Sequence, residues 1–287
     1  MLQTPVLAEI PSTVVPADYD AYLFDLDGTI YLGDELLPGA ERTVRTLKER
    51  GKVVRFLSNN PTKSPEQYAQ KLVRLGIPAT VDDITTSIVT TLWWLRTHHP
   101  NAVLFPIAEE PLCAALVEAG FELSDDPKRI DIVIASYDRT FTYSKLQIAF
   151  DALWFYKRAI LIQTNPDRFC PFPGGHGEPD AAAITAAIEA CTQVRCQASM
   201  GKPSSLMVDA VLAQLDIPRS RCLMTGDRLA TDIRMALDAG LGAALVFTGE
   251  TRPEDVTSEY SAVWQLDSIE DLIDSPVFVH STSHGLK

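Results

Sequence analysis

The chain of 287 residues is long enough for one large domain or two moderate ones, since domains average about 150 residues. Its 46% hydrophobic and 22% charged residues are typical of globular proteins and exclude a disordered or fibrous chain. No stretch approaches the ~18 uninterrupted apolar residues of a membrane span. Residues 1–15 lack the pattern of a signal peptide, so we expect a cytoplasmic protein.

The net charge of −13 makes the chain a poor candidate for binding nucleic acid or anionic membranes. Its five cysteines form no CxxC pair, which disfavours both a disulfide scaffold and a zinc site. Such an acidic chain would suit a protein that binds divalent cations, although acidity alone is no evidence of a cation site.

Short apolar runs alternate with helical patterns, and this alternation predicts an α/β fold with a largely parallel sheet. The first and last parts of the chain contain four of the predicted strands, at 21–24, 53–57, 222–225 and 243–247. Helices are predicted over 39–50 and 204–215. A third helix opens at Ser64, where Pro65 fits the first turn and Gln67 completes a capping box.

The middle of the chain has an α/β rhythm of its own. Strands are predicted at 102–105, 130–135 and 160–163, and helices at 85–98, 110–119 and 143–157. The pattern changes after residue 78, and a Pro/Gly-rich stretch follows at 171–179. We therefore predict a discontinuous core over 18–82 and 181–275, an inserted module over 83–180, and terminal tails over 1–17 and 276–287.

Polar clusters stand where predicted strands end or where a helix begins. They are Asp25-Leu26-Asp27-Gly28-Thr29, Ser58-Asn59-Asn60, Gly201-Lys202-Pro203 and Gly226-Asp227. In an open parallel sheet, ligands bind outside the carboxyl ends of the strands, so these clusters can converge on one crevice. Each cluster alone is also common as an ordinary turn, and only their combination in this order favours a functional site.

Asp25 and Asp27 could both address one ligand, because residues two apart in an extended segment point the same way. Carboxylates so close repel when ionised, and a shared proton or a bound cation removes that cost. Mg²⁺ takes carboxylates, a backbone carbonyl and waters, and Asp227 would complete its protein ligands. Gly28 lets the backbone turn and offer an amide to an anion.

Three further side chains suit an anionic substrate. Ser58 can donate its hydroxyl, and Asn59 its amide, to phosphoryl oxygens. Lys202 is a compact positive charge close to a helix N-terminus, where anions are favoured. Arg228, beside Asp227, is expected at the surface or behind the site rather than on the substrate.

With these residues identified, the chain resembles the haloacid dehalogenase-like hydrolase superfamily, in its branch of p-nitrophenylphosphatase-, phosphoglycolate phosphatase- and NagD-like enzymes. The resemblance covers about residues 20–271 and includes two stretches typical of the branch, at 137–141 and 164–167. Its four motifs, in order, are Phe-Asp-Leu-Asp-Gly-Thr-Ile (24–30), Ser-Asn-Asn (58–60), Gly-Lys-Pro-Ser (201–204) and Gly-Asp-Arg-Leu-Ala-Thr-Asp-Ile (226–233). The interval between Ser58 and Lys202 far exceeds the ~30 residues of one βα unit. The resemblance therefore implies a Rossmann-like core with an inserted α/β cap domain.

By this resemblance, Asp25 is the nucleophile that forms an aspartyl-phosphate, and Asp27 is the general acid and base. Mg²⁺ would be held by Asp25, Asp227 and the backbone carbonyl of Asp27, with Asp232 just behind them. The phosphoryl group would be held by Gly28, Ser58, Asn59 and Lys202. The candidates for contact with the leaving group, where the cap meets the core, are Arg139, Asn165, Asp167, Arg168 and His176.

Two residues depart from the family pattern: Ala230 replaces a common acidic residue, and Asp180 stands where many relatives have glycine. Neither belongs to the catalytic set, so the departures bear on the pocket and not on the chemistry. The family also implies a possible homodimer through the cap, where Trp94 or Trp154 could lie.

The sequence thus predicts a Mg²⁺-dependent phosphatase for a sugar phosphate, phosphoglycolate or glycerol phosphate, with p-nitrophenyl phosphate as an artificial substrate. One alternative is a phosphotransferase, such as a phosphomutase, that uses the same intermediate. Another is a catalytically silent binding protein, which the loss of Asp25, Asp27, Lys202 or Asp227 would have favoured. A dehalogenase is disfavoured, because displacement at carbon needs neither Asp27 nor Asp227.

Overall fold

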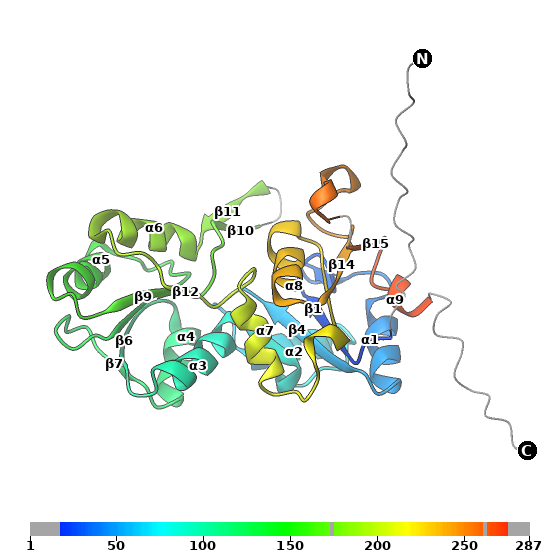
Figure 1. Cartoon of the computed structure of the whole chain (residues 1–287), viewed down its shortest axis with the longest axis horizontal. Coiled ribbons are helices and arrows are strands. Elements are labelled where there is room, and N and C mark those ends of the chain that lie inside the picture. The colour runs from blue at the N-terminus through cyan, green and yellow to red at the C-terminus, as the bar shows by residue number, and fades with distance from the viewer. Residues whose placement is uncertain (1–17, 173–174, 261–262, 275–287) are drawn as a thin grey trace, which may run out of the picture.

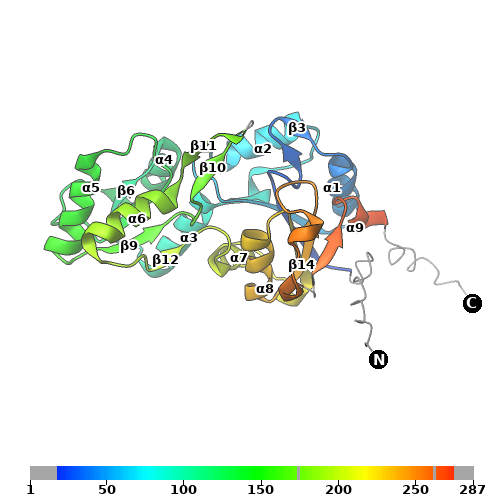
Figure 2. The ribbon, with the colours of Figure 1, turned by 90° about the horizontal axis from the view of Figure 1, so that it is seen from above.

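The computed structural model describes residues 18–172, 175–260 and 263–274, so the predicted tails at 1–17 and 276–287 lie outside the described residues. Two units lie side by side along the long axis of the molecule (Figures 1 and 2). The core unit is built on a six-stranded sheet and the cap unit on a five-stranded sheet. All strand pairs within these two sheets are parallel, which confirms the predicted α/β class.

The core sheet has the strand order β15-β14-β13-β1-β4-β5. Its strands are β1 (Ala21–Asp25), β4 (Val53–Ser58), β5 (Ile84–Thr86), β13 (Cys222–Gly226), β14 (Gly242–Val246) and β15 (Trp264–Leu266). From β1 the chain moves outward to β4 and β5, and after the cap it returns to β13 on the other side of β1. This reversal makes the carboxyl ends of β1 and β13 a topological switch point, where α/β proteins bind ligands.

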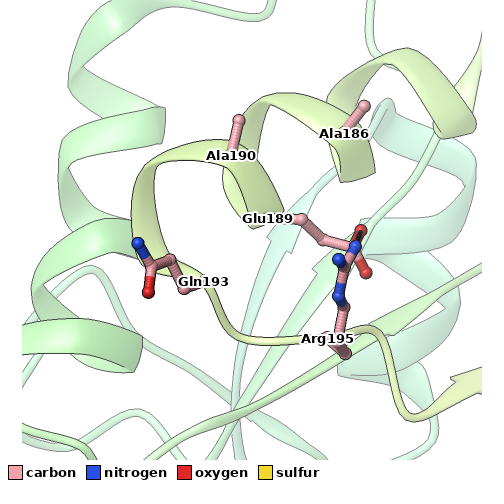
Figure 3. A pocket seen from close by; sticks show the side chains of 5 residues that line it. All are labelled: Ala186, Glu189, Ala190, Gln193 and Arg195. Atoms are coloured by element: carbon pink, nitrogen blue, oxygen red, sulfur yellow. Dashed lines mark hydrogen bonds and ion pairs between the residues drawn. The ribbon is translucent and has the colours of Figure 1, made fainter.

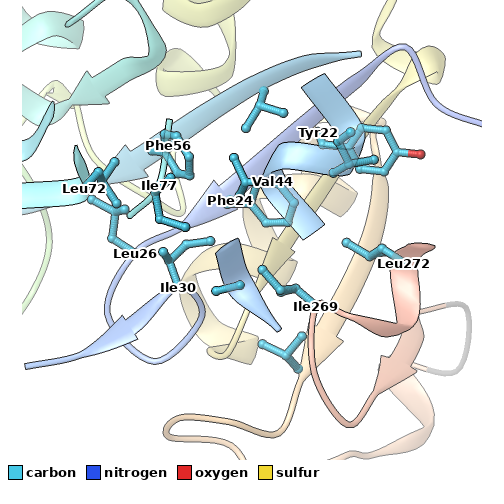
Figure 4. Close-up of a cluster of buried hydrophobic side chains, with 14 of the residues drawn as sticks. Tyr22, Phe24, Leu26, Ile30, Val44, Phe56, Leu72, Ile77, Ile269 and Leu272 are labelled. Atoms are coloured by element: carbon cyan, nitrogen blue, oxygen red, sulfur yellow. The ribbon is translucent and has the colours of Figure 1, made fainter. Parts of the chain in front are cut away.

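Helices cover both faces of the core sheet. They are α1 (Ala40–Glu49), α2 (Pro65–Arg74), α7 (Ser205–Leu212), α8 (Arg234–Ala239) and α9 (Asp271–Asp274). Every residue of β1 is buried, because its side chains alternate between two faces of the sheet that are both covered by helices. Tyr22 and Phe24 belong to one buried cluster with Val44 of α1 and Leu72 of α2 (Figure 4), whereas Leu23 belongs to the cluster that includes α7 and α8 on the opposite face.

The N-terminus of α2 has the predicted capping box. Gln67 N–H donates to Ser64 Oγ at 3.4 Å, and Ser64 N–H donates to Gln67 Oε1 at 2.8 Å. Pro65 occupies the first turn, where its missing N–H costs nothing. A short hairpin of β2 (Tyr31–Leu32) and β3 (Glu35–Leu36) lies between β1 and α1.

The cap sheet has the order β12-β9-β8-β6-β7. Its strands are β6 (Val103–Ile107), β7 (Glu122–Leu123), β8 (Ile132–Ala135), β9 (Ile160–Gln163) and β12 (Ala198–Ser199). Its helices are α3 (Ser87–His98), α4 (Glu110–Glu118), α5 (Tyr143–Phe150) and α6 (Ala181–Thr192). A separate antiparallel hairpin of β10 (Phe169–Pro171) and β11 (Gly177–Pro179) follows β9.

The division between the sheets differs from the predicted limits of 83 and 180. The predicted limit at 180 assigned α6 and β12 to the core, but β12 pairs with β9 of the cap sheet. Ile184 and Ile188 of α6 pack in the cap with Ala149 and Leu161. Because this apolar stripe faces the cap sheet, the chain returns to the core only after β12, and we propose a cap over 87–199.

Two predicted helices also have different bounds. The helix predicted over 85–98 begins at Ser87, because residues 84–86 pair with β4 as an edge strand of the core. The helix predicted over 143–157 is α-helical to Phe150 and continues as a π-helical turn, Asp151–Phe155. Trp94 is buried in the cap, whereas Trp154 is 48% exposed, so of these two only Trp154 is available for the predicted dimer contact.

The described part of the chain has no helix that combines the length and the apolar composition needed to span a bilayer.

Asp83 ties three segments of the core together. Its Oδ2 accepts from Lys48 Nζ at 2.8 Å and from Thr80 N–H at 2.9 Å, and its Oδ1 accepts from Arg55 at 3.2 Å. Burial alone would raise the pKa of Asp83, but the hydrogen bonds from Lys48 and Thr80 hold it below its ordinary value. The carboxylate therefore stabilises the folded chain when it is ionised.

Asp83→Asn should lower the free energy of unfolding by about 2 kcal/mol at pH 7, because Lys48 and Arg55 lose a charged acceptor. The pKa of Asp83 is lowered on folding. Its contribution to stability is therefore complete above the unfolded-state pKa of about 3.9 and is lost as the pH falls through the folded-state pKa. Urea denaturation at pH 7 and pH 3 measures both effects. Asp82→Asn, at the exposed neighbouring carboxylate, is the matched control. An equal effect of both substitutions at pH 7 would contradict this assignment.

Candidate active site

The predicted polar clusters meet at the carboxyl edge of the core sheet. Asp25 is the last residue of β1, Ser58 is the last residue of β4, and Asp227 follows β13 directly. Lys202 arrives from the cap side, between β12 and α7. The site therefore lies at the switch point, on the side of the core from which both connections to the cap leave.

A cluster of carboxylates occupies the centre of this edge. One oxygen from each of Asp25, Asp227 and Asp232 lies within 4.8 Å of the other two, and all three residues are buried. Burial and the neighbouring charges of Asp25 and Asp232 raise the pKa of Asp227 to about 7. Burial raises the pKa of Asp232 to about 6, although Lys202 opposes that rise. The crowding of negative charge therefore calls for a compensating cation.

Lys202 supplies part of that compensation. Its ammonium forms an ion pair with Asp25 Oδ1 and lies 2.7 Å from Asp232 Oδ1. Burial would lower the pKa of Lys202, but the charges of Asp232 and Asp25 raise it above its ordinary value. The side chain is therefore a fixed, buried positive charge beside the predicted nucleophile.

Asp227 is enclosed by backbone. Glu250 N–H donates to Asp227 Oδ2 at 2.7 Å. Gly28 has a φ of 87°, and a Cβ atom there would lie 2.5 Å from Asp227 Oδ2. Gly28 is therefore required both for its positive φ and for the close approach of the two loops.

The residues present fit a divalent cation. Among the described residues, no hydrogen-bond donor contacts the buried Asp227 Oδ1. A carboxylate oxygen is the type of ligand that a hard cation prefers. The carboxylate of Asp227 also belongs to a set of converging carboxylates. Asp232, which the sequence placed behind the metal ligands, belongs to this set and also pairs with Lys202.

The side chain of Asp27 is exposed to solvent, unlike that of Asp25. Even so, desolvation by the surrounding chain and the charge of Asp25 raise the pKa of Asp27. A carboxyl group that holds its proton more tightly than usual, at a position open to solvent, suits a general acid that later activates water.

Ser58 lies at the end of β4 with its hydroxyl among polar neighbours. Ser58 Oγ donates to the Tyr68 hydroxyl at 3.1 Å and accepts from Asn60 N–H at 3.3 Å. Tyr68 is buried in α2, so it fixes the Ser58 hydroxyl from behind. Tyr68 was not singled out from the sequence, because the buried face of a helix does not reveal which residues have a polar partner.

The Asn59 side chain is hydrogen-bonded to Lys202 and Asp167. Its Nδ2 donates to Lys202 O at 2.9 Å and to Asp167 Oδ2 at 3.0 Å, while its Oδ1 accepts from Lys202 N–H at 2.7 Å. Both amide protons are therefore engaged, and the side chain has no free donor for a phosphoryl oxygen. Donation from the Asn59 amide to a phosphoryl oxygen stays a prediction, and it would require one of these hydrogen bonds to break.

The five candidates for contact with a leaving group lie in three different places. Asn165 and Asp167 lie against the core, where Asn165 Nδ2 donates to Asn59 O at 3.3 Å. Arg139 instead forms two hydrogen bonds to Glu109 of the cap, at 2.6 and 2.7 Å. The other two are exposed and lie beside or within the β10–β11 hairpin: Arg168 and His176.

The loop after β14 also belongs to the site and was not singled out from the sequence. Thr248 Oγ1 donates to Gly28 O at 2.5 Å, and Glu250 N–H donates to Asp227. Arg228 forms an ion pair with Glu250 at 3.0 Å. The strand predicted at 243–247 was the available signal, because the residues that follow it must reach the same edge of the sheet.

A pocket on the cap lies away from this site. It is lined by Ala186, Glu189 and Ala190 of α6 and by Gln193 and Arg195 just beyond it (Figure 3). Glu189 and Arg195 form an ion pair at 3.0 Å, and Arg195 is largely exposed. The pocket contains none of the predicted site residues, so we do not assign the chemistry to it.

Comparisons with known proteins agree with the geometry. Residues 22–122 match the haloacid dehalogenase-like hydrolase family, and residues 199–272 match a related family described as HAD-hydrolase-like. The chain is 34% identical over 93% of its length to the sugar-phosphatase AraL of Bacillus subtilis, of which it covers 96%. It is 34% identical over 84% of its length to the 5′-nucleotidase YutF of the same organism, of which it covers 92%. The crystal structure of a 4-nitrophenylphosphatase from Thermotoga maritima superposes with a TM-score of 0.82 and 33% identity, over 89% of this chain and 96% of that one.

Proposed function

The chain belongs to the haloacid dehalogenase-like hydrolase family and is a phosphoric monoester hydrolase, and from this premise we propose that it hydrolyses a small phosphorylated metabolite through an aspartyl-phosphate on Asp25. The observation that carries the proposal is the meeting of Asp25 with Lys202 and two further carboxylates at the switch point of the core sheet. A nucleophile, a fixed positive charge and a place for a cation are thereby gathered on one edge.

In the first step, the Asp25 carboxylate oxygen forms a bond to phosphorus while the phosphorus–oxygen bond to the leaving group breaks. Asp27 gives its proton to the departing oxygen, for which its raised pKa suits it. In the second step, ionised Asp27 takes a proton from water, and the hydroxide oxygen bonds to phosphorus. The bond to Asp25 breaks, and inorganic phosphate leaves.

The charge that accumulates on the phosphoryl oxygens is met by residues already in place. Lys202 lies against Asp25. The Ser58 hydroxyl stands at the end of the neighbouring strand and would donate to a phosphoryl oxygen once the Tyr68 hydroxyl becomes the donor in their hydrogen bond. Asp25, Asp227 and the backbone carbonyl of Asp27 would hold Mg²⁺, which when bound offsets the charge of the carboxylates and of the phosphoryl group. Electrostatic stabilisation of this kind supplies much of the rate in phosphoryl transfer.

The substrate class follows from the relatives. AraL is named a sugar phosphatase, YutF a 5′-nucleotidase, and the Thermotoga enzyme a 4-nitrophenylphosphatase. We propose a sugar phosphate, phosphoglycolate or glycerol phosphate as substrate, with p-nitrophenyl phosphate as an artificial one. Asp27, which we propose as both general acid and general base, is exposed and therefore accessible to water. This access favours hydrolysis over transfer of the phosphoryl group to a second substrate.

The proposal predicts turnover of p-nitrophenyl phosphate in Mg²⁺, a fall of at least about 100-fold in a chelator, and recovery when Mg²⁺ is restored. Release of p-nitrophenol and of inorganic phosphate, measured together, should agree in amount. Release of p-nitrophenol that outruns phosphate in the presence of sugar hydroxyls would favour a phosphotransferase. Absence of turnover with Mg²⁺, on a panel that includes the three metabolite classes, would favour the silent binding protein.

A further inference from the structure

Asn59 is hydrogen-bonded to both connections between the core and the cap, at Ser87 and at Lys202. The backbone carbonyl oxygen of Asn59 accepts hydrogen bonds from Ser87 Oγ at 2.8 Å and from Asn165 Nδ2 at 3.3 Å. Ser87 begins α3, the first element of the cap, and Asn165 follows β9 of the cap sheet. Two segments of the cap are therefore hydrogen-bonded to the backbone of one core residue.

The side chain of the same residue holds the backbone of Lys202. Its oxygen accepts from Lys202 N–H and its nitrogen donates to Lys202 O, as a neighbouring β-strand would do. The fit is close, because a Cβ atom on Gly201 would lie 2.6 Å from Asn59 Oδ1. These two hydrogen bonds, here called the clamp, hold the backbone of Lys202. The Lys202 side chain extends from that backbone to Asp25, so the clamp determines where the ammonium charge lies.

Asp167 determines which way the Asn59 amide faces. Asp167 Oδ2 accepts from Asn59 Nδ2, and the Asp167 backbone N–H donates to Asn165 Oδ1 at 2.9 Å. An ionised carboxylate only accepts, so it can face the nitrogen of the amide but not the oxygen. A rotated amide would place Asn59 Oδ1 against both Asp167 and the Lys202 carbonyl, and would release the Lys202 N–H.

We propose that Asn59 and Asp167 are positioning residues, which act through the Lys202 backbone to hold the Lys202 ammonium against Asp25 when the cap is seated. This inference rests on the proposed function, because the position of Lys202 affects turnover only if Asp25 receives a phosphoryl group. It is an alternative to two predicted roles, the donation from Asn59 to phosphate and the contact of Asp167 with a leaving group.

Asp167→Ala should lower kcat by about 10- to 100-fold, because small errors in the position of a catalytic group have effects of that size. KM should change by less than about threefold, and the loss should be equal for p-nitrophenyl phosphate and for a sugar phosphate, since the clamp does not touch the leaving group. Asp167→Asn keeps an acceptor of the same shape and should recover most of the wild-type kcat. Combined with Asn59→Ala, Asp167→Ala should cause no further loss, because both act through one contact.

Two variants separate positioning from general loosening of the junction. Asp180→Asn changes the neighbouring buried carboxylate, which contacts Asn165 and Ala181 but not Asn59, and it should lower kcat by less than Asp167→Ala does. Asn59→Asp turns the donor toward Asp167 into an acceptor at constant volume, and it should reproduce the loss of kcat even if Asp167→Ala does not fold.

A rise in KM that depends on the leaving group would overturn the proposal, because it would place Asp167 on the substrate. Additive losses in the double variant, or equal losses in Asp180→Asn, would also overturn it. These outcomes all require an active wild-type enzyme, so they are distinct from a failure of the proposed function, in which the wild-type chain itself would not hydrolyse phosphomonoesters.

Discussion

Replacing Asp25 by asparagine should lower kcat for p-nitrophenyl phosphate by about 10⁴-fold or more, which is the range found when a nucleophile is removed. An amide cannot form the acyl phosphate, so no covalent intermediate should accumulate. The fold should persist, because asparagine has the same shape and Lys202 keeps Asp232 as a partner. Steady-state kinetics and a thermal melt of the same preparation measure both expectations.

The control for this experiment is Asp125→Asn, at an exposed carboxylate of the cap that should have no effect on kcat or on the melting temperature. A second readout is BeF₃⁻, a phosphoryl mimic, which should bind to the wild-type protein with Mg²⁺ and fail to bind to Asp25→Asn. An Asp25→Asn enzyme with a kcat within tenfold of the wild type would show that the phosphoryl group is carried elsewhere or not at all.

Lys202→Met should combine a loss of activity with a loss of stability. The variant keeps the length of the side chain but removes the charge beside Asp25, and kcat should fall by about 10²- to 10³-fold. Asp25 and Asp232 then remain buried without their cation, and breaking a buried ion pair in this way costs about 3 kcal/mol or more. Urea denaturation in a chelator measures the cost at pH 8.

The pH dependence of this variant has a definite sign. The pKa of Asp232 is already raised to about 6, and removal of Lys202 should raise it further. A carboxyl group whose pKa is raised on folding favours the folded state at low pH, and this advantage is lost as the pH rises through the folded pKa. The loss of stability should therefore be smaller at pH 5 than at pH 8.

Mg²⁺ should restore part of the stability of Lys202→Met at pH 8, because it would offset the same carboxylates and binding favours the folded state. Lys128→Met, at an exposed lysine of the cap, should change neither activity nor stability. A Lys202→Met protein as stable as the wild type in chelator at pH 8 would contradict the view that Lys202 offsets the buried carboxylates.

Local pattern was sufficient for much of the architecture. The buried runs at the start and near the end of the chain are β1 and β13, and the residues that follow them, Asp25 and Asp227, meet as the carboxyl ends of parallel strands must. The capping box at Ser64 was also predictable, since it depends only on residues three apart.

Local pattern was not sufficient to assign α6 and β12 to a sheet. The apolar stripe of α6 would fit either unit, and only its packing against Ala149 and Leu161 decides for the cap. Residues 84–86 likewise continue the pattern of the following helix, and they are a strand only because β4 offers an unpaired edge. Propensity is a weak prior that such tertiary contacts override.

The sequence by itself determined which residue types follow the strands and precede α7, and hence the chemistry that we propose for the site: Asp25, Asp27, Lys202 and Asp227. Only the tertiary structure decided which partners Asn59 and Asp167 have, because their contacts join segments more than a hundred residues apart. Side-chain periodicity places a residue on a face of its own helix or strand. Which distant backbone then satisfies its hydrogen bonds depends on how the core and the cap pack together.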